Sequence, residues 1–133
     1  MEKLEHIEIA VTNLEEANKL FARLLGTEHY KIEDVPSEGV RTSFFKVGDV
    51  KIEILEASDA NSPIAKFVGK RGEGIHHLAF EVEDIQKSIK EYADRGFQVI
   101  NSEPKKGADN KLVSFLHPRS TNGVLIELCQ DIS

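Results

Sequence analysis

The sequence predicts an α+β fold made of two consecutive βαβββ modules. One alternating apolar segment occurs twice, as HIEIAVTNL at 6–14 and as HLAFEVEDI at 77–85. Each copy is followed by a stretch of helical spacing and then by three strand-like runs. The copies keep the same register, since His6 and His77 lie 71 residues apart, as do Asn13 and Asp84. Such self-similarity is typical of a duplicated structural unit.

The first module covers about residues 1–60. After the first strand, a helix is expected from residue 14, because apolar residues recur there at helical spacing. Asn13 suits its N-cap, with Glu16 placed to close a capping box, and Gly26 suits its end. Strands are expected near 28–35, 41–47 and 50–56, with a hairpin at Gly48 and Asp49.

A short connecting helix at about 62–72 begins with Ser62 as N-cap and Pro63 at the first helical position. The second module covers about 74–133. Its helix follows Asp84 and ends at Gly96, and its strands are expected near 97–100, 112–117 and 124–129. The Lys-, Gly- and Asn-rich stretch at 101–111 is expected to be a mobile loop.

Bulk composition narrows the class of protein. The 133 residues carry a net charge of −6, which argues against nucleic-acid binding through bulk electrostatics. No apolar run approaches the roughly 20 residues that span a bilayer. The single cysteine, Cys129, excludes an internal disulfide and is expected to be a small buried hydrophobe. No secretory leader is recognised, so a cytoplasmic location is expected.

Four side chains are predicted to share the polar face of the strands. Because strand residues alternate between faces, His6 and His77 point away from the apolar residues beside them. By the same alternation, Glu53 and Glu127 point away from the apolar faces of the two final strands. The duplication therefore gives one His and one Glu at matching places in each module.

Two imidazoles and two carboxylates are typical of a site for a divalent first-row metal such as Co, Mn, Ni or Zn. Four protein ligands leave an open coordination position, as catalysis requires. Taken singly, a lone His is usually structural, and a Glu between isoleucines usually faces water. The repeated spacing favours the metal site. Glu8 and Glu81, on the same face as the histidines, are either supporting residues or simply solvated.

The sequence resembles known families over essentially the whole chain. Three runs carry the resemblance most clearly: GEGIHHLAFEVEDI (72–85), SPIAKFVGKRG (62–72) and FLHPRSTNGVLIEL (115–128). They are similar to the vicinal oxygen chelate superfamily and, within it, to the methylmalonyl-CoA epimerases. The resemblance implies a cupped, incomplete eight-stranded barrel with helices outside, a homodimer, and a bound divalent metal, cobalt before Mn, Ni or Zn.

The same resemblance implies that His6, His77 and Glu127 are metal ligands. The fourth ligand position is often Gln in this family, and here it is Glu53, as in glyoxalase I. Some epimerases carry a catalytic Glu on the third strand of the first module, where this chain has Thr42.

The function implied is interconversion of (R)- and (S)-methylmalonyl-CoA by proton removal next to the thioester. Glu53 and Glu127 are the expected acid/base residues. The basic residues expected to contact the CoA phosphates are Lys105, Lys106, Lys111 and Arg119, with Lys70 as a further candidate. The alternatives are a glyoxalase I-like lactoylglutathione lyase and, in another class, a non-catalytic binding protein of the same fold. A ring-cleaving dioxygenase is less favoured.

Overall fold

The computed structural model describes residues 1–132, which form two compact units. The N-terminal unit is His6–His76. The C-terminal unit joins Met1–Glu5 to the chain from His77 onward. The first residues belong there because the Glu2 N–H donates a 2.8 Å hydrogen bond to the carbonyl of Glu81.

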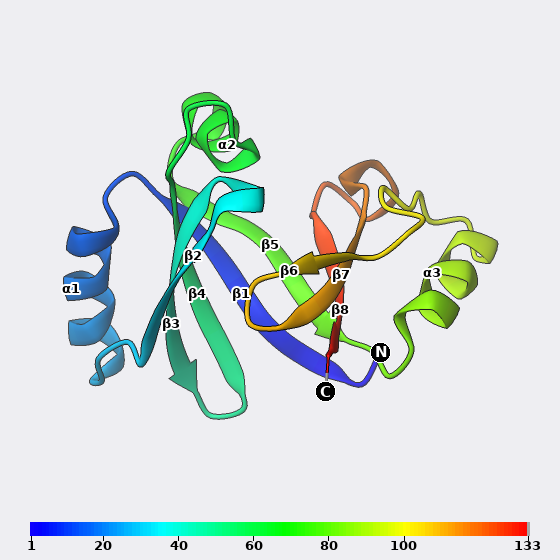
Figure 1. Ribbon diagram of the computed structural model, residues 1–133, viewed down its shortest axis with the longest axis horizontal. Helices are drawn as coiled ribbons and strands as arrows, with labels where there is room; N and C mark the ends of the chain where they lie inside the picture. The colour runs from blue at the N-terminus through cyan, green and yellow to red at the C-terminus, as the bar shows by residue number, and fades with distance from the viewer. Residues whose placement is uncertain (133) are drawn as a thin grey trace. The chain divides into compact units, whose positions relative to one another are not determined.

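The N-terminal unit has the predicted order of strand, helix and three strands (Figure 1). Its elements are β1 (Lys3–Val11, which starts in the other unit), α1 (Leu14–Leu25), β2 (Lys31–Val35), β3 (Val40–Val47), β4 (Val50–Ala57) and the connecting helix α2 (Pro63–Arg71). The strand order is β2-β3-β4-β1. The β1–β4 pair is parallel, and the other pairs are antiparallel.

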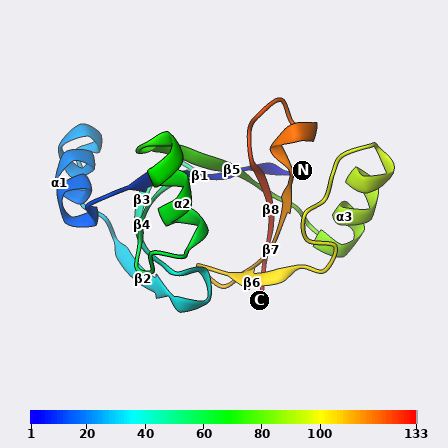
Figure 2. The same cartoon turned by 90° about the horizontal axis from the view of Figure 1, so that it is seen from above.

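The C-terminal unit repeats this plan. Its elements are β5 (Gly74–Glu81), α3 (Ile85–Asp94), β6 (Lys105–Gly107), β7 (Lys111–Leu116) and β8 (Ile126–Asp131), in the strand order β5-β8-β7-β6. Again the first and last strands, β5 and β8, are parallel neighbours. Figure 2 shows α3 beside the strands β7 and β8 of this unit. The predicted pair of βαβββ modules is confirmed.

Both module helices begin with the predicted caps. The side chain of Asn13 accepts a 3.0 Å hydrogen bond from the N–H of Glu16, and that of Asp84 accepts one of 3.2 Å from Lys87. Gly26 ends α1 in the left-handed conformation, with φ 73°. These contacts satisfy backbone groups that a helix leaves unpaired at its ends. Ser62 caps α2 in the same way.

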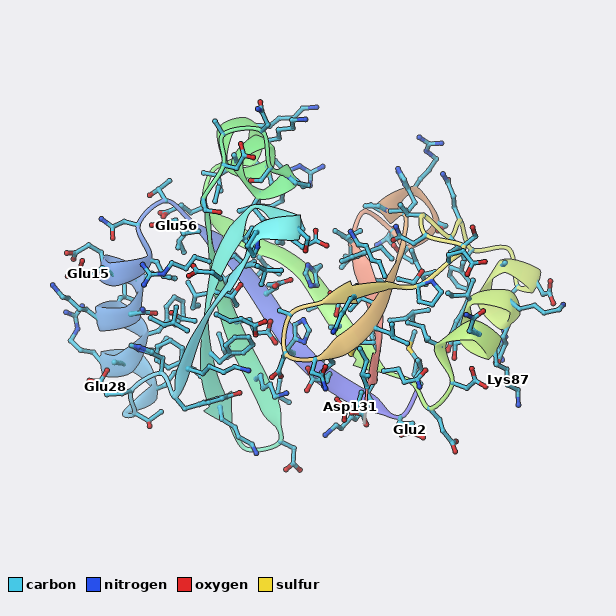
Figure 3. All side chains as sticks on the ribbon, viewed as in Figure 1. Glu2, Glu15, Glu28, Glu56, Lys87 and Asp131 are labelled. Carbon is cyan, nitrogen blue, oxygen red and sulfur yellow. The ribbon has the colours of Figure 1, made fainter. Side chains whose placement is uncertain are left out.

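A second cap, which sequence reasoning did not foresee, is also duplicated. The carboxylate of Glu56 on β4 (labelled in Figure 3) accepts a 2.7 Å hydrogen bond from the N–H of Leu14. The side-chain oxygen of Gln130 on β8 accepts one of 2.8 Å from the N–H of Ile85. Each module thus ties the start of its helix to its last strand.

Each helix covers one face of its own strands, and the core lies there. In the N-terminal unit, Val11, Leu14, Phe45 and Ile54 form the buried cluster under α1. In the C-terminal unit, the corresponding cluster is Val82, Ile85, Ile89, Leu116 and Leu128. The residues that alternate with these along β1, β4, β5 and β8 therefore face away from the helices.

The prediction for the second strand of the C-terminal module was wrong. Residues 97–100 contribute only a single bridge, between Val99 and Leu116. The strand is β6, inside the stretch expected to be a loop. Its sequence, Lys-Lys-Gly, has no apolar alternation that would predict a strand. Gly107 allows this pairing, because a Cβ there would lie 3.1 Å from the Val113 side chain.

None of the helices in the described residues is long and apolar enough to cross a membrane.

Candidate functional site

A buried His–Glu pair lies on the helix-free face of the N-terminal unit. His6 Nδ1 lies 3.2 Å from Glu53 Oε2. The two residues are 4% and 2% exposed. The parallel β1–β4 register explains why His6 and Glu53 lie close together. Glu8 is the partner of Glu53, and His6 lies two residues before Glu8 on the same face. A ligand atom of Glu8, also buried, lies within 4.8 Å of one on His6.

The C-terminal unit holds an equivalent pair. His77 Nε2 lies 3.1 Å from Glu127 Oε1, and both residues are buried. In the parallel β5–β8 register Ala79 is the partner of Glu127, and His77 precedes Ala79 by two residues. Each unit therefore brings together the His and the Glu that the sequence placed on one face.

The spacing within each pair suits two adjacent ligands of one cation. With metal–ligand distances of about 2.1 Å, two ligand atoms are about 3.0 Å apart at a right angle and about 3.4 Å apart at a tetrahedral angle. The observed 3.1 and 3.2 Å fall between these values. A hydrogen bond has similar length, but burying an ionised carboxylate is costly without a positive charge beside it. A divalent cation would supply that charge, as would protonation of the neighbouring histidine.

A phenylalanine stands beside each glutamate. Phe44 on β3 is the partner of Glu53, and Phe115 on β7 is the partner of Glu127. The ring of Phe115 packs edge-on against His77, with centroids 5.3 Å apart. The ring of Phe115 limits how the imidazole of His77 can turn.

The basic residues expected to bind phosphate differ in their surroundings. Lys105, Lys106 and Arg119 are exposed, and the ammonium of Lys105 lies 5.9 Å from the centroid of the Phe115 ring. Lys111, in contrast, is 5% exposed, and its ammonium group pairs with Asp131 (labelled in Figure 3). A phosphate contact from Lys111 would require this pair to break.

Cys129 is a buried hydrophobe, as expected. Its Sγ lies 3.6 Å from the carbonyl oxygen of Phe80, in a cluster with Ala79, Val113 and Phe115. Burial, reinforced by the charge of Glu127, raises the pKa of the thiol far above its usual range. A thiol that stays protonated is a poor nucleophile.

Two other histidines have structural contacts. His76 packs edge-on against Phe67 of α2, with centroids 4.9 Å apart. His117 Nδ1 accepts a 3.0 Å hydrogen bond from the N–H of Arg119.

Thr42 has a polar group that sequence reasoning did not use. It is buried on β3, and its Oγ1 has no hydrogen-bond partner among residues 1–132. The signal was present in the duplication, since the residue 71 positions later is Val113. The same offset pairs Glu8 with Ala79. Both N-terminal residues are polar where their counterparts are apolar.

Comparison with known proteins places the chain in a family. The model of the glyoxalase/bleomycin resistance protein/dioxygenase superfamily matches residues 5–115. The chain belongs to this superfamily. The ethylmalonyl-CoA/methylmalonyl-CoA epimerase of Cereibacter sphaeroides is 42% identical over 130 residues, covering 96% of this chain and 97% of that protein.

Solved structures agree over the full length. A Streptomyces coelicolor methylmalonyl-CoA epimerase variant with 2-nitronate-propionyl-CoA is 29% identical with a TM-score of 0.95, covering 100% of this chain and 96% of that one. A methylmalonyl-CoA epimerase with methylmalonyl-CoA and NH4+ is also 29% identical, with a TM-score of 0.94 and the same coverage. The expected fold class and the resemblance to these epimerases are confirmed.

Proposed function

We propose that this chain is a metal-dependent enzyme that interconverts (R)- and (S)-methylmalonyl-CoA by removing the proton next to the thioester. The observation that carries the proposal is the buried His–Glu pair repeated in each unit, at a spacing that suits metal ligands. Full-length similarity to methylmalonyl-CoA epimerases supports the substrate class.

The proposed ligands are His6, Glu53, His77 and Glu127, binding one ion. Two carboxylates offset the charge of a divalent cation, and the nitrogen and oxygen donors suit cobalt first, then Mn, Ni or Zn. A bound ion acts as a Lewis acid that stabilises negative charge on substrate oxygens. Four protein ligands leave room for a substrate oxygen.

Glu53 and Glu127 are the proposed acid/base residues. Inversion at a carbon needs one group that takes a proton from one face and another that returns a proton to the opposite face. The duplication provides one carboxylate from each module, each held beside a histidine and a phenylalanine. Thr42 cannot be such a base, because a hydroxyl does not ionise near neutral pH, so the N-terminal carboxylate is assigned to Glu53.

The CoA phosphates are proposed to lie along Lys105, Lys106 and Arg119. Lys105 connects this basic surface to the candidate site, because it lies over Phe115, which packs against His77. Alanine at both Lys105 and Lys106 should weaken substrate binding and reduce its salt dependence, since fewer cations would face the phosphates. A cytoplasmic homodimer is proposed as the working form.

The test is exchange of the methylmalonyl-CoA α-proton in deuterated water, followed by NMR on the purified, cobalt-loaded protein. Exchange that is lost with a chelator and restored by cobalt is the expected result. Turnover of the methylglyoxal–glutathione hemithioacetal without α-proton exchange would instead identify a lactoylglutathione lyase. Binding of methylmalonyl-CoA with no turnover of either substrate would identify a binding protein.

A further inference from the structure

We infer, on the basis of the proposed function, that Thr42 is a substrate-binding residue whose hydroxyl donates a hydrogen bond to the free carboxylate of a 2-carboxyacyl thioester. Three features of β3 and its neighbours lead to this: the face on which Thr42 lies, the lack of a partner for its hydroxyl, and the residue found at the same place in the other module.

Thr42 lies on the polar face of the N-terminal unit. In the antiparallel β3–β4 register, Phe44 is the partner of Glu53, and Thr42 is the partner of Leu55. Paired residues share a face, so Thr42 and Glu53 are diagonal neighbours, with side chains about 7–8 Å apart at their bases. A small acyl group that contacts Glu53 would therefore come within reach of Thr42.

The hydroxyl of Thr42 is fully buried without a hydrogen-bond partner in the described part of the chain. Its strand neighbours on this face, Val40 and Phe44, are buried and apolar, as is its partner Leu55 on β4. Its partner on β2 is Glu33, whose carboxylate lies 3.7 Å from the ammonium group of Lys31. Buried hydroxyls are nearly always hydrogen-bonded, because leaving one unbonded costs free energy. A bound molecule can supply the missing acceptor.

The duplicated module shows that the fold does not need this hydroxyl. Val113 on β7 is the partner of Cys129, as Thr42 is the partner of Leu55, and Val113 packs in an apolar cluster. Valine has the shape of threonine without the polar group. Packing therefore does not require the hydroxyl. The hydroxyl is present in the module in which it lies on the same face as Glu53.

Ser43 shows why the face matters. It is another buried hydroxyl without a partner among residues 1–132, but it is paired with Ile54, on the side covered by α1. A substrate that meets Glu53 cannot meet Ser43 through the sheet. Of these two hydroxyls, that of Thr42 is the one that shares a face with His6 and Glu53.

The direction of the hydrogen bond follows from the substrate. The carbon that loses its proton carries a thioester and a carboxylate, whose oxygens only accept hydrogen bonds. Thr42 must then donate, and a charged acceptor gives the stronger bond. This hydrogen bond should make the protein bind acyl thioesters with a free carboxylate more tightly than those without one.

The experiment compares Thr42→Val with the wild type, using metal content, thermal stability, kcat and KM for methylmalonyl-CoA, and calorimetric affinities for malonyl-CoA and propionyl-CoA. We expect unchanged metal content, equal or higher thermal stability, and about ten- to one-hundred-fold lower malonyl-CoA affinity and kcat/KM. Propionyl-CoA affinity should stay within about twofold, and Thr42→Ser should restore malonyl-CoA binding. Ser43→Ala is the matched control and should change neither affinity.

Unchanged malonyl-CoA affinity in Thr42→Val, or an equal loss for both thioesters, overturns the inference, as does lower thermal stability accompanying the loss. If Thr42→Val does not fold, the comparison moves to Thr42→Ala and Thr42→Ser, and equal malonyl-CoA affinity in those two overturns it. The affinity measurements do not depend on catalysis. A wild type that binds malonyl-CoA but exchanges no proton defeats the epimerase proposal alone.

Discussion

In the N-terminal unit, the face that holds His6 and Glu53 also carries Glu8 and Thr42, whereas the C-terminal unit has Ala79 and Val113 at those two places. Both units keep the buried His–Glu pair and the phenylalanine beside the glutamate. Ala79 and Val113 lie with Cys129 in one buried apolar cluster.

The shared residues and the differing ones have different explanations. Residues that the duplication keeps in both modules are those that a symmetric task needs, such as holding one ion. Residues present in only one module have an asymmetric task, because the fold itself accepts the apolar alternative. An epimerase with the proposed metal site would need both kinds, since the ion would bind two similar pairs while the substrate has two unlike substituents.

The largest effect is expected from removing one acid/base carboxylate. Glu53→Gln and Glu127→Gln should each lower epimerisation by about 10²–10⁴-fold, the range typical of general acid–base catalysis. If the two residues serve opposite faces, each variant should lose α-proton exchange preferentially from one epimer. Exchange from pure (R)- and pure (S)-methylmalonyl-CoA, followed separately, measures this. Equal residual exchange from both epimers in both variants would contradict the division of roles.

A smaller effect is expected at Glu8, which has no counterpart carboxylate in the C-terminal unit. Glu8→Ala makes the N-terminal face resemble that around Ala79. The loss of a buried carboxylate close to His6 should reduce cobalt affinity by about 10–100-fold, as is typical of residues that support metal ligands. Competition with a chromophoric chelator measures this affinity. Unchanged affinity would show that Glu8 does not support the ion.

The duplicated helix caps give a matched test of stability. Glu56→Ala should destabilise the protein by about 1.5–3 kcal/mol, because the acceptor for the Leu14 N–H is charged. Gln130→Ala should cost about 0.5–1.5 kcal/mol, because its acceptor is neutral. Urea unfolding at pH 7 compares them. A larger loss at Gln130 would reverse the expected order.

A last effect depends on pH and concerns Cys129, whose counterpart in the N-terminal unit is Leu55. The folded thiol has a raised pKa, so its contribution to stability is complete below the unfolded pKa of about 8.5 and is lost as the pH rises above that value. Stability should therefore fall by up to about 1.4 kcal/mol per pH unit there, and less steeply in Cys129→Ala. Urea unfolding at pH 7.5 and 10 measures the difference. Equal pH dependence in both proteins would contradict the buried, protonated thiol.

Much of the architecture could be predicted from the sequence because two patterns agreed, namely the alternation of side chains along each strand and the repeat after 71 residues. Alternation placed His6 and Glu53 on one face, and the offset of 71 residues confirmed the assignment by repeating it at His77. The caps at Asn13 and Asp84 were visible for the same reason. Where a strand has no alternation, as in β6, neither signal exists, and the strand was placed eight residues too early.

Other features depend on cross-strand partners, which no local pattern gives. Lys111 looked like a surface cation in a basic stretch, but the β7–β8 register sets it opposite Asp131. Thr42 looked like a departure from a family pattern. Its burial and the missing partner of its hydroxyl come from the structure and not from any local sequence pattern.

The central claim is that the His–Glu pairs of both modules bind one ion, and counting cobalt per chain tests it most directly. The account predicts one cobalt ion per wild-type chain by elemental analysis after equilibrium dialysis. His6→Ala and His77→Ala should each lose that ion under the same conditions while remaining folded. Two ions per wild-type chain, or full cobalt loading in either variant, would contradict it.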